Sequence, residues 1–244
     1  MKDIPLLITT CILPSAPYTK LNNIQERLHH TITGLRELSK IASNNNVVIC
    51  DGSGFDFSDY QAEIESLFCK SEIISFKNNY EMVKIKGKGY GEGEIVKYAI
   101  SHSKLINQAQ KFAKITGKLW VENLNSLISI QKTDAAFLPT LSKYDLPICI
   151  DTRFYICSLS FYKKFLIDVH ELVDDRQGNH LEDIFFKKLK SINIEVSDVI
   201  FRKYPVIRGC SGTTANIYKQ KKYEIFKKML KLYLYIFVNR GKTF

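Results

Sequence analysis

Apolar residues in the first third of the chain alternate between short continuous runs and runs with helical spacing. The continuous runs at residues 5–10, 47–50 and 72–76 are typical of strands buried on both faces. Between the first two, apolar residues recur in steps of three and four, which predicts a long amphipathic helix from Leu21 to Ile41. A shorter helix is predicted over 58–68. This alternation predicts an α/β fold with a mostly parallel sheet and helices on both faces.

The rest of the chain is less regular. The pattern predicts a glycine-rich basic loop over 84–94, a helix over about 92–106, strands over 112–123 with a turn at Gly117, one or two strands over 147–158 broken at Asp151, helices over 161–172 and 181–189, a last strand within 196–205, and a loop over 208–214. The apolar positions Ile225, Met229, Leu232 and Ile236 then predict a C-terminal amphipathic helix.

Charge separates this last segment from the body. The protein has 244 residues and a formal net charge of +10. Residues 219–244 carry seven Lys, one Arg and one Glu, a net +7, whereas residues 1–218 are nearly balanced at +3. We therefore expect one domain over 1–218 and a basic amphipathic helix over 219–244. Such a helix suits an anionic membrane surface, and packing against the domain is the alternative interpretation.

Composition is that of a globular protein, with 45% hydrophobic and 25% charged residues. The six cysteines include no CxxC pair and favour a reducing compartment over a disulfide framework. No apolar run approaches the ~20 residues of a spanning helix, and the start of the sequence predicts no signal peptide. We expect a cytoplasmic protein, peripheral on the inner membrane if the basic helix docks there.

Polar segments follow the predicted strands, at the edge of a parallel sheet where ligands bind. They comprise Thr9 and Thr10, then Asp51, Gly52 and Ser53, the 84–94 segment, and residues near 114–123 and 151–153. In the glycine-rich segment, Gly89 permits close backbone approach and Lys86 and Lys88 add charge, so a phosphate is the expected ligand. A surface loop with solvated lysines is the alternative, and Glu92 would then cap the following helix.

A second basic cluster lies at residues 114–118. Lys114 and Lys118 flank Thr116 and Gly117, an arrangement that could bind a diphosphate without a metal ion. A hairpin with exposed lysines is the other interpretation.

Several motifs in order resemble those of bacterial GT-A-like glycosyltransferases of lipopolysaccharide and capsular polysaccharide biosynthesis, in a variant without the DxD motif. They are the early TT…P, DGSG (51–54), ERL (26–28), KGKGYGEGE (86–94), KITGK (114–118), DTRF (151–154), LED (181–183) and GCSGTT (209–214). The resemblance covers most of residues 5–215. It implies a GT-A-like, Rossmann-like fold, a nucleotide-sugar donor such as a UDP-sugar, and a saccharide or lipid-linked saccharide acceptor.

The resemblance also implies residue roles. Asp51, Gly52 and Ser53 would meet the base and ribose, with Thr9, Thr10 and Arg27 also on the donor. Glu182 and Asp183 would supply the catalytic base, with Asp151 as the runner-up. The expected acceptor or accessory residues are Arg153, His180, Arg208 and Ser211.

The departure from the family pattern concerns metal binding. No Asp is followed two positions later by another Asp, and KITGK stands where the DxD is expected. We therefore expect metal-independent hexosyl transfer with no cofactor, although Asp174 and Asp175 form an acidic pair that a divalent cation would use. A nucleic-acid-binding module, favoured by the net charge, and a nucleotidyltransferase are the competing hypotheses.

Overall fold

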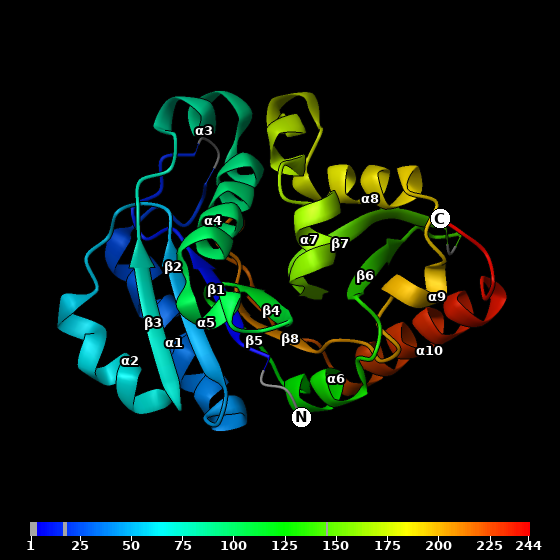
Figure 1. Ribbon diagram of the computed structural model, residues 1–244, viewed down its shortest axis with the longest axis horizontal. Coiled ribbons are helices and arrows are strands. Elements are labelled where there is room, and N and C mark those ends of the chain that lie inside the picture. Colours follow the sequence, from blue (N-terminus) through cyan, green and yellow to red (C-terminus); the bar gives the residue numbers. More distant parts are fainter. Residues whose placement is uncertain (1–3, 17–18, 145) are drawn as a thin grey trace.

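The computed structural model describes residues 4–16, 19–144 and 146–244, so the first three residues of the 1–218 unit lie outside it. Its main feature is a six-stranded sheet in the order β3-β2-β1-β4-β7-β6 (Figure 1). Strands β3, β2, β1 and β4 are parallel, whereas β7 runs antiparallel to both β4 and β6. The strands are β1 (Leu6–Thr10), β2 (Asn46–Asp51), β3 (Lys70–Ser75), β4 (Lys111–Thr116), β6 (Ala135–Leu141) and β7 (Pro147–Ser158).

Helices cover both faces of this sheet, as predicted. Alternate strand residues point to opposite faces, so Leu6 and Ile8 belong to one core cluster and Leu7 to the other. The helices packed on the first face are α1 (Ile24–Ala42), α2 (Gln61–Leu67), α6 (Leu124–Ile130) and α10 (Lys222–Val238). Those on the second face are α3 (Tyr80–Lys86), α4 (Lys88–His102), α5 (Lys104–Asn107), α7 (Leu159–Phe165) and α8 (Leu181–Ser191).

A small antiparallel sheet lies beside the main one. It has the order β5-β8-β9, formed by β5 (Leu119–Val121), β8 (Ile207–Cys210) and β9 (Ile217–Tyr218). Gly209 has φ +114°, and a Cβ there would lie 2.1 Å from the carbonyl oxygen of Lys118. Only glycine therefore lets β8 approach the turn between β4 and β5 this closely.

The structure corrects four predictions. The expected glycine-rich loop over 84–94 is helical, since α3 ends at Lys86 and α4 begins at Lys88. Residues 147–158 form one unbroken strand, because β7 continues through Asp151. The expected last strand within 196–205 is instead the short helix α9 (Val196–Val199), and the expected loop over 208–214 begins as strand β8. Strand β6 was not predicted, since Pro139 interrupts its apolar run.

The basic C-terminal helix is present and is fixed to the domain. Within α10, Leu232 and Tyr235 are buried in the core cluster of the first face, and Ile225 and Ile236 pack against it. None of the helices within the described residues is long and apolar enough to cross a membrane.

Candidate active site

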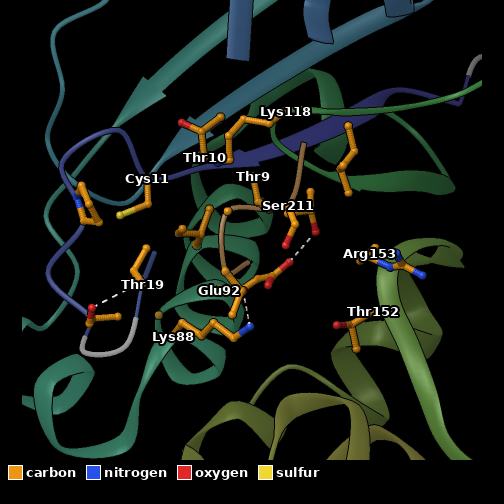
Figure 2. Close-up of a pocket in the computed structure, with 18 of the residues that line it drawn as sticks. Thr9, Thr10, Cys11, Thr19, Lys88, Glu92, Lys118, Thr152, Arg153 and Ser211 are labelled. Atoms are coloured by element: carbon orange, nitrogen blue, oxygen red, sulfur yellow. Dashed lines mark hydrogen bonds between the residues drawn. The ribbon is translucent and has the colours of Figure 1, made fainter. Parts of the chain in front are cut away.

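A cavity of about 480 Å³ opens where strands β1 and β4 end. Figure 2 shows Lys118 and Thr10 on one side and Thr152 and Arg153 of β7 on the other, with Glu92 of α4 between them. The predicted site residues that line the cavity are Thr9, Thr10, Arg27, Lys88, Glu92, Thr116, Lys118, Asp151, Arg153, Glu182 and Ser211. The structure therefore brings together residues separated by up to two hundred positions in the sequence.

Lys118 supplies a buried positive charge to this cavity. It is only 5% exposed, and no hydrogen bond or ion pair of its ammonium group is found within the described residues. Burial, reinforced by the nearby Arg27 guanidinium, lowers the pKa of Lys118 to about 8. Its φ is +72°, in the left-handed region that non-glycine residues rarely adopt. A strained, buried and unpaired lysine is typical of a site that binds an anion.

Arg27 adds a second cation beside Lys118. Its guanidinium donates hydrogen bonds to the carbonyl oxygens of Cys11 and Leu21, at 2.8 Å from Nε and 2.7 Å from Nη1. Burial lowers the pKa of Arg27, although arginine stays charged at neutral pH. The side chain thus orders the segment after β1 and brings positive charge to the cavity.

Lys114 is bound by groups of the protein itself. It is 1% exposed and does not line the cavity, because its ammonium group donates to Glu92, to Thr116 Oγ1 at 2.7 Å and to the carbonyl oxygen of Thr152 at 2.8 Å. Burial alone would raise the pKa of Glu92, but the charge and hydrogen bonds of Lys114 outweigh it and lower that pKa. The pair fixes α4 against β4 and β7.

We expect Glu92→Gln to lower the free energy of unfolding by about 3 kcal/mol, because it leaves the Lys114 ammonium buried without its counter-charge. The double variant Glu92→Gln with Lys114→Met should recover most of this loss, since both charges are then removed. Urea unfolding of the single and double variants measures both effects. Equal destabilisation in the two would contradict the assignment of a buried ion pair.

The glycine-rich segment binds the protein's own carboxylate. Gly87, with φ +99°, separates α3 from α4, and the amide of Gly89 donates to Asp175 Oδ2 at 3.1 Å. Lys86 donates to the carbonyl oxygen of Glu171, and His180 Nδ1 lies 3.0 Å from Asp175 Oδ1. The start of α4 is therefore already occupied by an anion, and Gly89, Lys86 and His180 do not line the cavity.

The DGS turn is likewise an internal structure. Asp51 is fully buried, and its carboxylate accepts hydrogen bonds from Thr10 Oγ1 (2.5 Å), Ser53 Oγ (2.5 Å) and the amide of Ile12 (3.0 Å), among others. Asp51, Gly52 and Ser53 do not line the cavity. They hold the segment after β1 in place beneath its wall.

Three carboxylates line the cavity within the described residues. Glu92 is paired with Lys114, and Asp151 forms a forked ion pair with Arg153, whose Nε lies 2.8 Å from Asp151 Oδ1. Glu182 forms no ion pair with any residue that the structure describes, and it accepts a hydrogen bond from Thr152 Oγ1 at 3.0 Å. Burial raises the pKa of Glu182. Glu182 is therefore the cavity carboxylate best suited to take a proton.

Asp183, adjacent to Glu182, is not among the residues that line the cavity. Its Oδ2 accepts a hydrogen bond from the amide of His180 at 3.2 Å and caps the start of α8. Arg208 forms an ion pair with Glu122, with 2.9 Å between Arg208 Nε and Glu122 Oε1. The backbone amide of Gly117 donates a hydrogen bond to the carbonyl oxygen of Thr9 at 2.7 Å. None of these three predicted residues lines the cavity.

Two of the residues that line the cavity have a buried polar atom with no hydrogen-bond partner in the described part of the chain, Thr9 Oγ1 and Asn78 Oδ1. An unsatisfied buried polar atom is costly, so both are suited to a ligand that donates hydrogen bonds. Lys88 binds the segment after β8, since its ammonium donates to Thr213 Oγ1 at 2.6 Å.

Sequence analysis missed several residues that line the cavity. They include Cys11, Ser15, Thr19, Asn78, Thr140, Thr152, Cys210 and Tyr218. A signal was present for Thr152, which stands inside the singled-out DTRF motif. No group of three or more His, Cys, Asp or Glu side chains that could hold a metal ion is found among the residues that the structure describes.

The fold is GT-A-like, as three solved structures show. The bifunctional glycosyltransferase WbbM matches with 12% sequence identity and a TM-score of 0.53, and the match covers 95% of this chain and 44% of WbbM. Core-mannan synthase A of Aspergillus fumigatus, in an Mn/GDP form, matches with 10% identity and a TM-score of 0.51 over 99% of this chain and 86% of that protein. The glycosyltransferase GlyE of Streptococcus pneumoniae matches with 9% identity and a TM-score of 0.50 over 77% of this chain and 43% of GlyE. The chain spans less than half the length of WbbM and GlyE. The sequence itself matches no protein family model and no curated protein.

Proposed function

We propose that this protein is a glycosyltransferase that moves a sugar from a nucleotide-sugar donor to a saccharide acceptor. The observation that carries the proposal is the buried Lys118, which has no ion-pair partner among the described residues and lies beside Arg27, in the cavity at the strand ends of a GT-A-like sheet. Two fixed cations at this position suit the diphosphate of a sugar nucleotide.

The chemical role proposed for each cavity residue follows from its position in the cavity. As the bond between the sugar and the donor phosphate breaks, Lys118 and Arg27 stabilise the negative charge that develops on the leaving nucleoside diphosphate. In an inverting reaction, Glu182 on the opposite side would take the proton of the acceptor hydroxyl as that oxygen attacks the sugar carbon. Arg153, held by Asp151, is placed to bind a sugar hydroxyl or a phosphate oxygen.

We propose further that the donor is a UDP-sugar and the group moved a hexosyl unit. The acceptor would be a lipid-linked saccharide in bacterial surface polysaccharide synthesis, either lipopolysaccharide with its O-antigen or capsule. The enzyme would act in the cytoplasm, at the inner face of the inner membrane. The motif resemblance supports these details, and nucleic acid is not an expected partner.

Transfer should proceed equally in EDTA and in Mn²⁺, because Lys118 and Arg27 would provide the charge that a divalent cation otherwise supplies. Initial rates measured after dialysis against EDTA, with and without added Mn²⁺ or Mg²⁺, test this expectation. Asp174 and Asp175 are the alternative metal site, so the same assay is run on Asp174→Asn. A strict cation requirement would contradict metal-independent transfer.

The function is tested by nucleotide binding followed by product analysis. Thermal unfolding with UDP, GDP, CMP and dTDP should show a rise in Tm for one nucleotide, since ligand binding stabilises the folded state. The cavity variant Lys118→Met should lose this rise and the matched surface variant Lys132→Met, changed at an exposed lysine, should keep it. Incubation with the corresponding sugar nucleotide and candidate acceptors should release the nucleoside diphosphate. Release of pyrophosphate instead would indicate a nucleotidyltransferase and overturn the proposal.

A further inference from the structure

The outward side of α10 carries a stripe of large apolar residues. Phe226, Leu230, Tyr233 and Phe237 follow one another in steps of four, three and four, so they share one side of the helix. Phe226 and Tyr233 are each 67% exposed and Phe237 is 70% exposed. We call these four residues the outer stripe.

This stripe is distinct from the side of α10 that holds the helix on the domain. Leu232 and Tyr235 are buried, and Ile225 and Ile236 pack against the same core cluster. The apolar side predicted from the sequence is thus largely used in folding, whereas a second apolar side faces outward. Tyr223, Leu234 and Val238 are also exposed and widen it. A contiguous apolar surface of this kind marks an interaction site.

The charges around the outer stripe favour an anionic partner. Helix α10 contains Lys222, Lys227, Lys228 and Lys231, and Glu224 is its sole acidic residue. Lys227 lies over the ring of Tyr223, 5.6 Å from its centroid, so a cationic group lies directly against this apolar surface. A second copy of this chain docked through the same stripe would bring lysines against lysines, which is unfavourable. Anionic lipid headgroups above an apolar layer match both features.

We propose that the outer stripe is a membrane-binding surface, with α10 lying in the plane of an anionic bilayer. The four apolar side chains enter the boundary between headgroups and acyl chains, and the lysines bind lipid phosphates. This surface lies outside the cavity and stands independently of the transfer function proposed above.

Vesicle co-sedimentation tests the proposal on the full chain without donor or acceptor. The wild-type protein should bind vesicles of equal parts phosphatidylglycerol and phosphatidylcholine and not vesicles of phosphatidylcholine alone. Phe226→Gln with Phe237→Gln should weaken this binding by about tenfold or more, because membrane affinity scales with inserted apolar area. Lys222→Gln with Lys227→Gln should weaken it by a similar factor.

The matched control is Ile85→Gln with Leu172→Gln, two exposed apolar residues outside α10, which should bind vesicles like the wild type. Thermal unfolding of each variant establishes that its fold is retained. Vesicle binding by the Phe226/Phe237 variant equal to that of the wild type would overturn the proposal, as would failure of the wild type to bind. A wild-type dimer in solution that the same variant dissociates would identify the stripe as a self-association surface instead.

Discussion

Lys118→Met should lower kcat/KM by about 100-fold or more, because it removes the buried positive charge proposed to stabilise the leaving diphosphate. Methionine has a similar length and no charge, so the cavity keeps its shape. The same change should stabilise the ligand-free protein. Folding lowers the pKa of this lysine to about 8, so its charged form is less favourable in the folded state than in the unfolded one.

The pH dependence of stability follows with a definite sign. Between about pH 8 and the ordinary lysine pKa, the unfolded chain holds a proton at Lys118 that the folded chain has released. The free energy of unfolding contributed by this residue therefore rises with pH across that window, and is lowest below it. Urea unfolding at several pH values should show this rise in the wild type and not in Lys118→Met.

Lys132→Met serves as the control for both measurements, since this lysine is exposed. Steady-state kinetics and urea unfolding are carried out on all three proteins. A Lys118→Met protein with wild-type kcat/KM would remove the central element of the proposed function. Lower stability in that variant would show that Lys118 has a folding role that outweighs its cost of burial.

Glu182→Gln should lower kcat by a factor of about one hundred to ten thousand while leaving nucleotide affinity unchanged. Glutamine retains an oxygen that can accept the Thr152 hydrogen bond but cannot take a proton from the acceptor. Because burial raises the pKa of Glu182, the acid limb of the wild-type kcat profile should lie above the ordinary glutamate pKa. That limb should be absent in Glu182→Gln.

The matched control for this prediction is the neighbouring carboxylate. Asp183→Asn keeps an oxygen for the amide of His180 and should therefore leave kcat near the wild-type value. Stopped-time assays at saturating donor give kcat, and calorimetric titration gives nucleotide affinity. Equal loss in both variants, or full activity in Glu182→Gln, would rule out Glu182 as the base.

The alternation of strands and helices in the first third of the chain could be predicted from the sequence, because buried strands and amphipathic helices leave different apolar periods. The first three strands and α1 lie within a few residues of their predicted bounds. The glycine-rich segment could not be predicted in this way. Glycine has low helix propensity, yet Gly89, Gly91 and Gly93 are buried in α4 where tertiary packing outweighs that propensity. At Gly93, a Cβ would lie 2.1 Å from His170, so close packing requires glycine there.

In the candidate site, too, the sequence pattern could not predict which side chains tertiary contacts would occupy. Motif order led to Lys118, Glu182 and Arg153, all of which line the cavity. Spacing alone could not separate Lys114 from Lys118, although one is bound by Glu92 and the other has no such partner in the described structure. That distinction depends on Glu92 of α4, which lies more than twenty positions before Lys114 in the sequence, and on the turn that directs each lysine.

The left-handed backbone of Lys118 has a consequence for experiments that select variants by heat resistance. Glycine at that position would relieve the strained φ and remove a charge that is costly to bury. A library screened only for thermal tolerance should therefore enrich the substitution Lys118→Gly. A library screened for sugar transfer should keep lysine at position 118. Enrichment of glycine in the first library and of lysine in the second would show that folding stability and catalysis favour different residues at this position.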